Sequence, residues 1–443
     1  MIILYLVLSI VGIIFFSVRL KVHPFLALLL AALGYGFLAG MPAEKIVSSI
    51  NDGFGNTLGK IGLIIVLGVI IGAFLENTGA AYTLADKVLK LIGKKRVPAA
   101  MGIIGYIVSI PVFADSGFML ISPLNKSLSK RAGISLAGSA IALSLGLTAT
   151  HTLVPPTPGP IAAAGILGAD LGLVLMLGLL ISALATMVAV IFATKFAAKT
   201  YIEPSPEITE AEMNARMQHA PSAFKSSLPV VVPILLIVLK SSVSVLAGPD
   251  GGTVTKVLSF LGEPVIALLI GMFLAALLPK KLEAKMFSMS GWVGQSLSGA
   301  ASIILITGAG GIFGKVLQDS GIAELLSKVL ADVHLSIWLP FLLAAAIKTA
   351  QGSSTVALIT TASIMVPMMD TLGFVSPIEK AIVVIAVGAG SAVFSHANDS
   401  FFWVVTQLSG MDVKTGYRLH SLGTFVLGTS AAVFLFLFHL AFV

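Results

Sequence analysis

The segment Thr148–Pro160 reads TATHTLVPPTPGP and interrupts the apolar stretch that begins at residue 133. Four of its last six residues are proline. Proline removes a backbone donor and clashes with the preceding helical turn, so a helix cannot pass this point unbroken. At membrane depth, such backbone survives only where it is buried in protein or lines a wet cavity. Within a membrane-embedded chain, this segment therefore predicts a broken helix beside a polar site.

Composition indicates that the whole chain is such a protein. Its 443 residues are 57% hydrophobic and 11% charged, with no cysteine and a mean hydropathy of +1.04. A soluble chain is about 45–50% apolar and about 25% charged. These values exclude a soluble enzyme, a disordered chain and a disulfide scaffold. The apolar runs are continuous over about 20 residues, which is typical of membrane-spanning helices and not of barrel strands. We therefore expect an all-α polytopic membrane protein.

Hydropathy divides the chain into full spans and interrupted stretches. Ten segments are long enough to cross the bilayer: 2–18, 24–40, 58–76, 133–157, 172–197, 227–247, 256–279, 295–314, 377–397 and 420–442. Two further stretches, 98–125 and 335–372, are broken near their middles by proline, glycine and small polar residues. We interpret both as re-entrant helical hairpins that enter and leave on the same side.

The basic residues support this arrangement and predict an orientation. With these spans, 19 of the 27 Lys and Arg residues fall on one side and 8 on the other. The richer side is expected to be cytoplasmic, which puts both termini outside. The first apolar run has no basic region before it and no small-residue cleavage site after it, so we expect a retained helix. Short basic clusters between apolar runs indicate topology and not a nucleic-acid surface.

Two similar halves are predicted on either side of a polar linker. Residues Gly72–Gly79 read GAFLENTG, and Gly314–Gly321 read GKVLQDSG. Each motif precedes a hairpin and then a broken helix, and the two hairpins are expected to open on opposite sides. This order favours an inverted-topology repeat, although apolar helices rich in glycine also resemble each other by composition. The predicted units are a first half at 1–198, a cytoplasmic linker at 199–225 and a second half at 226–443.

Acidic and histidine residues lie within the interruptions. Asp115 lies in the first hairpin turn, at 109–117, and a carboxylate at membrane depth is typical of a proton or cation site. The alternative is a helix cap, and Asp399 has the same two readings. His151 and His396 each lie in a break, where they either titrate near physiological pH or hold the broken backbone as neutral groups.

The second hairpin turn carries a polar cluster, Lys348–Thr355, which reads KTAQGSST. Its amide and hydroxyl groups suit a ligand rich in hydroxyls, although serine and threonine also bridge helices. We expect Lys348 to extend its ammonium to the outer interface, with binding of a carboxylate as the alternative. The sequence contains no metal-ligand spacing, no phosphate-binding glycine motif and no sign of a cofactor. Transport would then use an ion gradient or none.

Four motifs resemble the gluconate permease family, the gluconate:proton symporters. They are PVFADSGF, HTLVPPTPGP, KTAQGSSTVA and SHANDSFFW, in this order along the chain. The resemblance implies proton-coupled uptake of gluconate or a related small anionic carboxylate in a bacterial cytoplasmic membrane. It also implies two inverted repeats with hairpins, in a homodimer that works by elevator motion. As substrate-binding candidates it gives Ser116, Thr152, Gln351, Ser353, Ser354, Thr355 and Asn398. As proton-coupling candidates it gives Asp115, His151, His396 and Asp399.

Other functions stay open at this point. A symporter of the same fold for D-serine or glycerate, or a sodium-coupled carrier, would show the same pattern. A passive channel also uses broken helices, but paired hairpins and an inverted repeat favour alternating access. A membrane-embedded enzyme would need a nucleophile–base spacing or a metal set that the sequence does not show.

Overall fold

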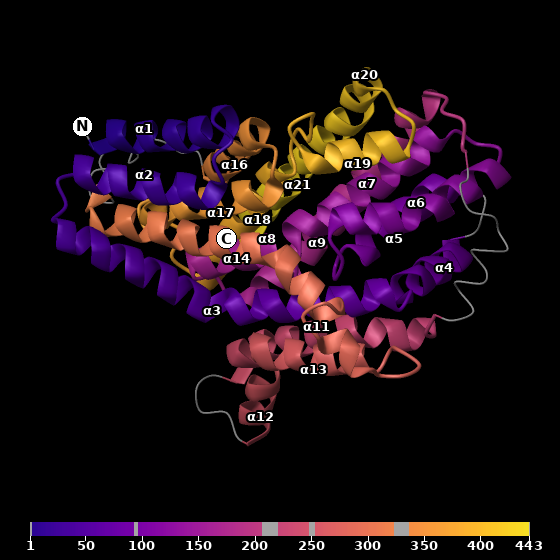
Figure 1. Ribbon diagram of the computed structural model, residues 1–443, viewed down its shortest axis with the longest axis horizontal. Coiled ribbons are helices and arrows are strands. Elements are labelled where there is room, and N and C mark those ends of the chain that lie inside the picture. The colour runs from indigo at the N-terminus through magenta and orange to yellow at the C-terminus, as the bar shows by residue number, and fades with distance from the viewer. Residues whose placement is uncertain (1, 93–95, 206–219, 248–252, 323–335, 443) are drawn as a thin grey trace.

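Helices form every regular element in a computed structural model of the chain, which describes residues 2–92, 96–205, 220–247, 253–322 and 336–442 (Figure 1). The predicted all-α fold class is confirmed. The first half contains α1 (Ile2–Ile14), η1 (Phe15–Arg19), α2 (Pro24–Leu38), α3 (Ala43–Asn77), α4 (Ala80–Ile92), α5 (Val97–Val108), α6 (Ala114–Arg131), α7 (Leu136–Leu153), α8 (Pro158–Leu167), α9 (Leu171–Lys195) and η3 (Ala197–Lys199). After residue 220 follow α11 (Ala223–Ala247), α12 (Thr253–Leu261), α13 (Pro264–Ala276), η4 (Ala284–Phe287), α14 (Trp292–Asp319), α16 (Trp338–Gln351), α17 (Ser354–Met365), η5 (Val366–Met368), α18 (Pro377–Ser391), α19 (Ser400–Leu408), α20 (Val413–Gly416), η6 (Tyr417–Ser421) and α21 (Leu422–Phe442).

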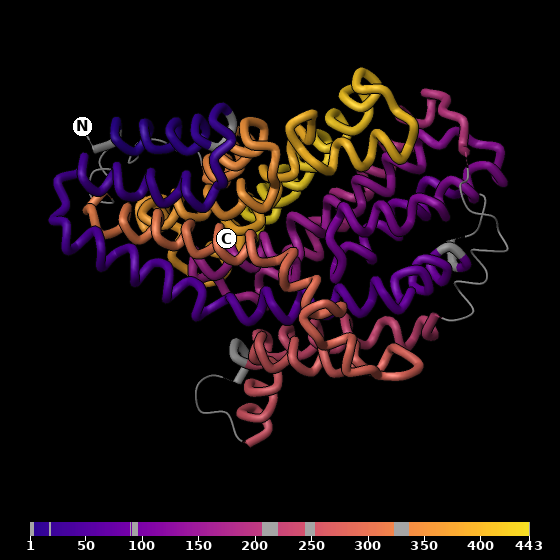
Figure 2. The backbone as a smooth tube through the Cα atoms, in the orientation of Figure 1, coloured from indigo at the N-terminus to yellow at the C-terminus, as the bar shows by residue number. Residues whose placement is uncertain are grey.

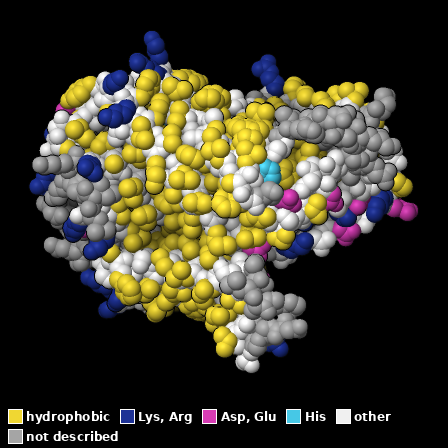
Figure 3. Space-filling model, turned by 180° about the vertical axis from the view of Figure 1, so that it is seen from behind, with side chains coloured by type: hydrophobic (Ala, Val, Ile, Leu, Met, Phe, Trp, Pro, Cys, Tyr) yellow, Lys and Arg dark blue, Asp and Glu magenta, His cyan; other side chains and the backbone are white. Residues whose placement is uncertain are grey.

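The helices are long and apolar enough for a multi-pass membrane protein. Six segments among the described residues meet the length and hydropathy needed to cross a bilayer, or seven if α12 and α13 together form one bent span. Large apolar side chains on α9 face outward, such as Met187 and Ile191 at 62% and 60% exposure. Figure 3 shows a broad hydrophobic surface with Lys and Arg side chains gathered at its margins. This distribution matches a protein whose sides face lipid and whose ends face water.

The two glycine-containing motifs form the same helix end. α3 ends at Asn77 and α14 ends at Asp319, and the glycines two positions later, Gly79 and Gly321, have φ values of +75° and +76°. This left-handed conformation strains any residue with a Cβ, which explains why glycine occupies both positions. The sequence match between the motifs is therefore also a structural match. Each helix precedes a hairpin (α5–α6 and α16–α17) and a broken helix (α7–α8 and α18–α19).

α3 and α14 cross in close antiparallel contact and join the two parts of the chain (Figure 2). A Cβ added at Gly53 would lie 2.6 Å from the carbonyl oxygen of Gly311, so the backbones touch at this point. At one end of the crossing, Ser49 donates to Asp319 over 2.8 Å. At the other end, the rings of Phe74 and Trp292 lie 5.4 Å apart. Small residues at such crossings allow membrane helices to approach closely.

Several predicted spans differ from the structure in their bounds. α3 starts at Ala43, fifteen residues before the predicted span at 58–76, because its first turns are polar but still pack on α14. The predicted span 256–279 is two helices at an angle of 64°, with Gly262 at the bend. The predicted span 133–157 ends at Leu153 and continues after the break as α8, which the hydropathy pattern missed. The predicted span 377–397 ends at Ser391, and α19 follows its break.

The hairpin interpretation agrees with the helix breaks that the structure contains. The stretch 98–125 folds as α5 and α6 around a turn at 109–113, and the described part of 335–372, from residue 336 on, folds as α16, α17 and η5 around Gly352. Most of the linker, 206–219, lies outside the described residues, so the division at 199–225 stays a prediction.

We expect Gly53→Ala to lower the melting temperature of the purified protein, because its Cβ would meet backbone that cannot move without separating α3 from α14. Overpacking of this kind costs about 1–3 kcal/mol. Gly55→Ala is the matched control on the same helix, since its Cβ would meet nothing within 4 Å, and it should leave stability unchanged or raised. Equal melting temperatures for the two variants would contradict a close crossing at Gly53.

Candidate functional site

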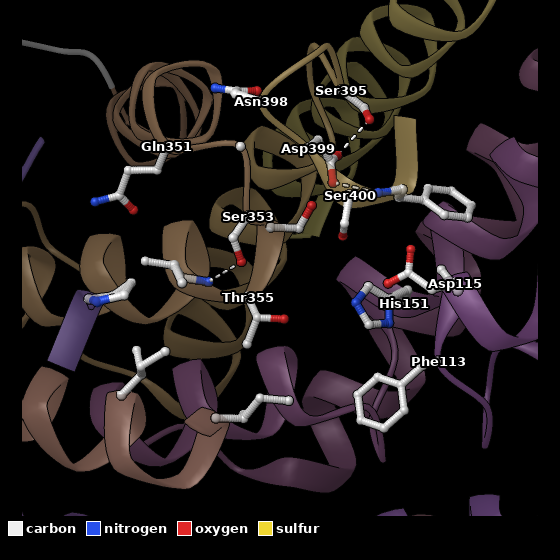
Figure 4. Close-up of a pocket in the computed structure, with 18 of the residues that line it drawn as sticks. Phe113, Asp115, His151, Gln351, Ser353, Thr355, Ser395, Asn398, Asp399 and Ser400 are labelled. Carbon is white, nitrogen blue, oxygen red and sulfur yellow. Dashed lines mark hydrogen bonds between the residues drawn. The ribbon is translucent and has the colours of Figure 1, made fainter. Parts of the chain in front are cut away.

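Both hairpin turns, the end of α7 and the break after α18 meet at one cavity of about 510 Å³, which we call the central cavity (Figure 4). Its walls also include the start of α2 and the middle of α14. Except for the middle of α14, each contributing segment is a place where a helix starts or stops, so backbone polar groups and short polar side chains collect there. A cavity of this size, with a few convergent polar groups, is typical of a small-molecule site.

Eight of the eleven site residues predicted from the sequence line this cavity: Asp115, His151, Gln351, Ser353, Ser354, Thr355, Asn398 and Asp399. Three do not line it. The Thr152 hydroxyl donates to the carbonyl of Thr148 over 2.9 Å, inside its own helix. Ser116 faces a neighbouring cavity, and His396 lies outside the lining.

Four helix N-termini contribute their first residues to the cavity wall. They are those of α2, α6, α17 and α19, represented by Pro24, Asp115, Thr355 and Ser400. The first amides of a helix have no partner within the helix and carry partial positive charge, so such ends attract anions. α6 has Asp115 in its first turn, and α19 is capped by Asp399, whose carboxylate accepts from the amide of Phe401 over 3.0 Å. α17 is capped by the neutral hydroxyl of Ser353.

Lys348 is buried beside the cavity, contrary to the expectation that it extends to the outer interface. Its side chain is 1% exposed, and its Nζ lies 2.5 Å from Oδ2 of Asp399. Nζ also donates to the carbonyl of Gly352, the residue that joins α16 to α17. The expectation was wrong because a carboxylate 51 positions along the chain neutralises the ammonium inside the protein, where an unpaired charge would be costly.

Asn398 and His396 hold the second hairpin turn in place. The Asn398 side-chain amide donates to the carbonyls of Thr349 and Ala350 over 2.9 and 3.1 Å. The Nε2 atom of His396 lies 2.8 Å from the same Thr349 carbonyl. These are last-turn carbonyls of α16 that the helix leaves without partners. Both side chains therefore satisfy interrupted backbone, which is the second of the two readings that the sequence left open for His396.

Asp115 and His151 lie together on the wall opposite the second hairpin (Figure 4). The Oδ1 atom of Asp115 and the Nδ1 atom of His151 are buried and have no hydrogen-bond partner among the described residues. The His151 ring lies 6.1 Å from the ring of Phe113. Figure 4 shows Ser353 and Thr355 on the other side of the space that these groups face. Unpartnered polar atoms in a cavity wall are available to a ligand.

Asp115 also lines a second cavity, of about 360 Å³, between the first hairpin turn, α3 and α14. This cavity contains Ser116 and Ser296 and reaches Glu76 at the end of α3. Of the residues that line both cavities, Asp115 is the one with a titratable side chain. Sequence reasoning assigned Glu76 to a helix end, where it is found, since α3 terminates one residue later.

Sequence reasoning missed several polar groups of the site. Ser395 and Ser400 belong to the second break but were not selected as site residues, and both line the cavity. His23 and Ser302 also line it, with His23 Nε2 lying 2.8 Å from the Ser302 hydroxyl. No sequence signal marks this pair, because its members are 279 residues apart and neither lies in a helix break.

A set of broken helices and hairpin turns around a polar cavity, inside a shell of lipid-facing helices, defines a membrane transport protein. The GntP family permease model matches residues 1–441, and the chain belongs to this permease family. Gluconate permease of Pseudomonas aeruginosa is 36% identical over 98% of this chain and 96% of its own length. Inner membrane permease YgbN of Escherichia coli K12 is 34% identical over 93% of this chain and 92% of its own.

The fold has a counterpart among solved structures. The crystal structure of the Alcanivorax borkumensis YdaH transporter, described as having an unusual topology, aligns with a TM-score of 0.67. The alignment covers 94% of this chain and 97% of the other, at 15% sequence identity. At this identity the likeness shows the shared fold alone.

We expect Asp399→Asn to destabilise the protein by about 3–5 kcal/mol, because it leaves the buried Lys348 ammonium without a counter-charge. The double variant Lys348→Gln with Asp399→Asn should recover much of this loss. Lys240→Gln serves as control, since Lys240 forms an ion pair of the same 2.5 Å length with Glu263, which is half exposed. The loss of this pair should cost under about 1 kcal/mol of stability. Thermal unfolding in detergent measures all three, and an Asp399→Asn effect no larger than that of Lys240→Gln would contradict the buried pair.

Proposed function

We propose that this permease takes up gluconate or a related small sugar acid, coupled to protons, across a bacterial cytoplasmic membrane. The observation that carries the proposal is the neutral N-terminus of α17 within the central cavity. It is supported by membership of the GntP permease family and by the relative named gluconate permease. The proposed orientation keeps both termini outside, as the distribution of basic residues predicts.

The substrate carboxylate is proposed to bind at the start of α17. Of the four helix N-termini in the cavity wall, those of α6 and α19 already have an aspartate close by. α2 begins with Pro24, which has no N–H, and the next amide, of Phe25, donates to His23 Nδ1 over 3.3 Å. The Ser353 hydroxyl accepts from the amide of Val356 over 3.3 Å, which leaves the amides of Ser354 and Thr355 for a ligand. Lys348 adds positive charge directly behind this position, through its bond to Gly352. Together these groups favour an anion there and not at the other three helix ends.

The hydroxyl groups of a sugar acid find partners along the remaining wall. Ser353, Ser354 and Thr355 offer hydroxyls on one side. The Nδ1 atom of His151, which has no partner among the described residues, faces them from the other. Gln351 and Ser400 extend the polar surface. A neutral ligand of similar size would satisfy the hydroxyl partners but would leave the positive end of α17 uncompensated.

Asp115 is proposed to pass protons between the two cavities. It lines both of them, and its buried Oδ1 atom has no hydrogen-bond partner among the described residues. The second cavity leads from Asp115 past Ser116 to Glu76 at the end of α3. A carboxylate in this position can exchange protons with either space as the protein changes conformation.

Uptake into proteoliposomes tests the function and the role of Asp115. We expect the wild type to accumulate labelled gluconate against its gradient when an inward proton gradient is imposed, in the absence of sodium. Asp115→Asn should retain gluconate exchange across a membrane without a gradient but lose the stimulation by the proton gradient. Glu203→Gln, on the exposed segment after η3, is the control and should behave as wild type.

Other outcomes would contradict specific parts of the proposal. Equilibration without accumulation would indicate a passive channel, and a strict requirement for sodium would indicate a sodium-coupled carrier. Unchanged stimulation by the proton gradient in Asp115→Asn would remove Asp115 from the proton path. Transport of D-serine or glycerate in preference to gluconate would change the assigned substrate.

We expect Thr355→Val to weaken gluconate binding by about 3–10-fold, because a lost hydrogen bond to a neutral partner is worth about 0.5–1.5 kcal/mol. Thr361→Val is the matched control on the same helix. The Thr361 hydroxyl is buried and has no partner among the described residues, so this change should leave binding unaltered. Equilibrium dialysis with labelled gluconate gives the dissociation constants, and equal values for the two variants would exclude Thr355 as a ligand.

A further inference from the structure

His420 is completely buried behind the second helix break, in η6 before α21. Its Nε2 atom lies 3.1 Å from the Ser395 hydroxyl, and its Nδ1 atom lies 3.3 Å from the hydroxyl of Ser144 on α7. The Ser395 hydroxyl in turn lies 2.5 Å from Oδ2 of Asp399, the same oxygen that pairs with Lys348. A continuous chain of hydrogen bonds therefore links Lys348 and Asp399, at the cavity wall, to an imidazole that solvent does not reach.

This hydrogen-bond network can accept one proton more than it contains when His420 is neutral. When Asp399 is ionised, the Ser395 hydrogen is directed at its carboxylate, so Nε2 of His420 must be the donor to Ser395. The Ser144 hydroxyl donates to the carbonyl of Ile141 over 2.9 Å, so its one hydrogen is not free for Nδ1. While the imidazole is neutral, the Ser144 hydroxyl can therefore donate either to the Ile141 carbonyl or to Nδ1 of His420, but not to both. A protonated imidazole donates to Ser144 as well, and every bond is formed at once.

The charged groups that act on His420 are Asp399 and, beyond it, Lys348. α19 faces the imidazole with the rings of Phe401 and Phe402, at 5.6 and 6.1 Å, and α7 faces it with Ser144. On η6 itself, the Arg418 guanidinium lies over the ring of Phe196. The charged residues at the start of α20, Asp412 and Lys414, are exposed. Besides the burial of its ring, Asp399 and Lys348 are thus the charged groups through which a substrate can influence whether His420 holds a proton.

We propose that His420 holds the coupling proton while substrate is bound. This inference rests on the proposed uptake of a sugar acid. In the empty site, Lys348 and Asp399 neutralise each other and His420 is neutral. A substrate carboxylate at the start of α17 lies next to Gly352, whose carbonyl Lys348 already contacts, and so competes with Asp399 for the ammonium. Asp399 then loses part of its pairing with the ammonium. A proton on His420 compensates the negative charge of Asp399 through the Ser395 hydroxyl.

This arrangement keeps the net charge of the site constant. Without substrate, the charges of Lys348, Asp399 and neutral His420 sum to zero. With one carboxylate and one proton added, the sum is again zero. An unprotonated loaded site would carry a net negative charge through the low-dielectric interior, where charge without compensation is expensive. Binding of one anion is therefore linked to uptake of one proton.

His420 has one free position for the proton that enters with the substrate. The neutral imidazole already carries its hydrogen on Nε2, where it donates to Ser395, so the added proton forms a new N–H bond at Nδ1 and no bond within the network breaks. The new N–H donates to the Ser144 hydroxyl, which keeps its own hydrogen on the Ile141 carbonyl. The loaded site then contains an ionised Asp399, an intact Ser395 hydroxyl and a protonated His420. Release of the substrate returns this proton to solution and restores the neutral imidazole.

Proton uptake on binding tests this assignment directly. Purified protein in weakly buffered detergent solution is mixed with gluconate near neutral pH, a pH-indicator dye reports the protons taken up, and equilibrium dialysis reports the gluconate bound. We expect the wild type to approach one proton per bound gluconate, with a dissociation constant that rises about tenfold per unit of pH. His420→Gln should bind gluconate, take up almost no proton and lose most of the pH dependence. Ser395→Ala, which cuts the link to Asp399, should behave in the same way.

Two control variants show whether the loss of proton uptake is specific to His420 or follows from removing any histidine or carboxylate. His439→Gln, at the far end of α21, should retain the wild-type proton uptake. Glu203→Gln, on the exposed segment after η3, should also retain it. Wild-type proton uptake in His420→Gln would overturn the inference while leaving the proposed function intact. If His420→Gln binds no gluconate, wild-type uptake in Ser395→Ala overturns it instead. A wild type that binds no gluconate, or binds it without protons, contradicts the proposed function itself.

Discussion

Interrupted backbone within a bilayer must find hydrogen-bond partners inside the protein, and the candidate site is built from groups that meet this requirement. The end of α16 is capped by Asn398 and His396 from the second break, and the Gly352 carbonyl is bonded by Lys348. Lys348 needs a counter-charge, which Asp399 supplies while also capping α19. Because these contacts all join the second hairpin to the second break, moving one segment changes the electrostatics of the whole cavity.

The first half of the chain completes the cavity in a different way. Asp115 and His151 have buried polar atoms without partners among the residues that the structure describes, and no described lysine or arginine lines the cavity beside them. The second half thus brings an internal ion pair and the open helix start of α17, whereas the first half brings a carboxylate and an imidazole that a ligand or proton can still satisfy. The close crossing of α3 and α14 holds the two walls against each other. We regard this asymmetry between two similar topologies as the physical basis for linking an anion to a proton.

Much of the fold could be predicted from the sequence, because proline and polar residues inside apolar runs mark helix breaks locally. The same signal located Asp115 and the cluster after Lys348. It could not show that Thr152 bonds within its own helix, or that Asn398 caps α16, since these outcomes depend on side-chain direction. The burial of Lys348 and the network around His420 depend on pairs distant in sequence, such as Ser144 and His420, 276 residues apart. Local patterns carry no information about such pairs.

A structure of the protein determined with bound gluconate would show whether the substrate carboxylate binds at the N-terminus of α17 and attracts the Lys348 ammonium. We expect ligand density in the central cavity, with the carboxylate within hydrogen-bond distance of the Ser354 and Thr355 amides and with Lys348 moved from Asp399 towards it. A carboxylate bound elsewhere, with the Lys348–Asp399 pair unchanged, would contradict binding at this helix start.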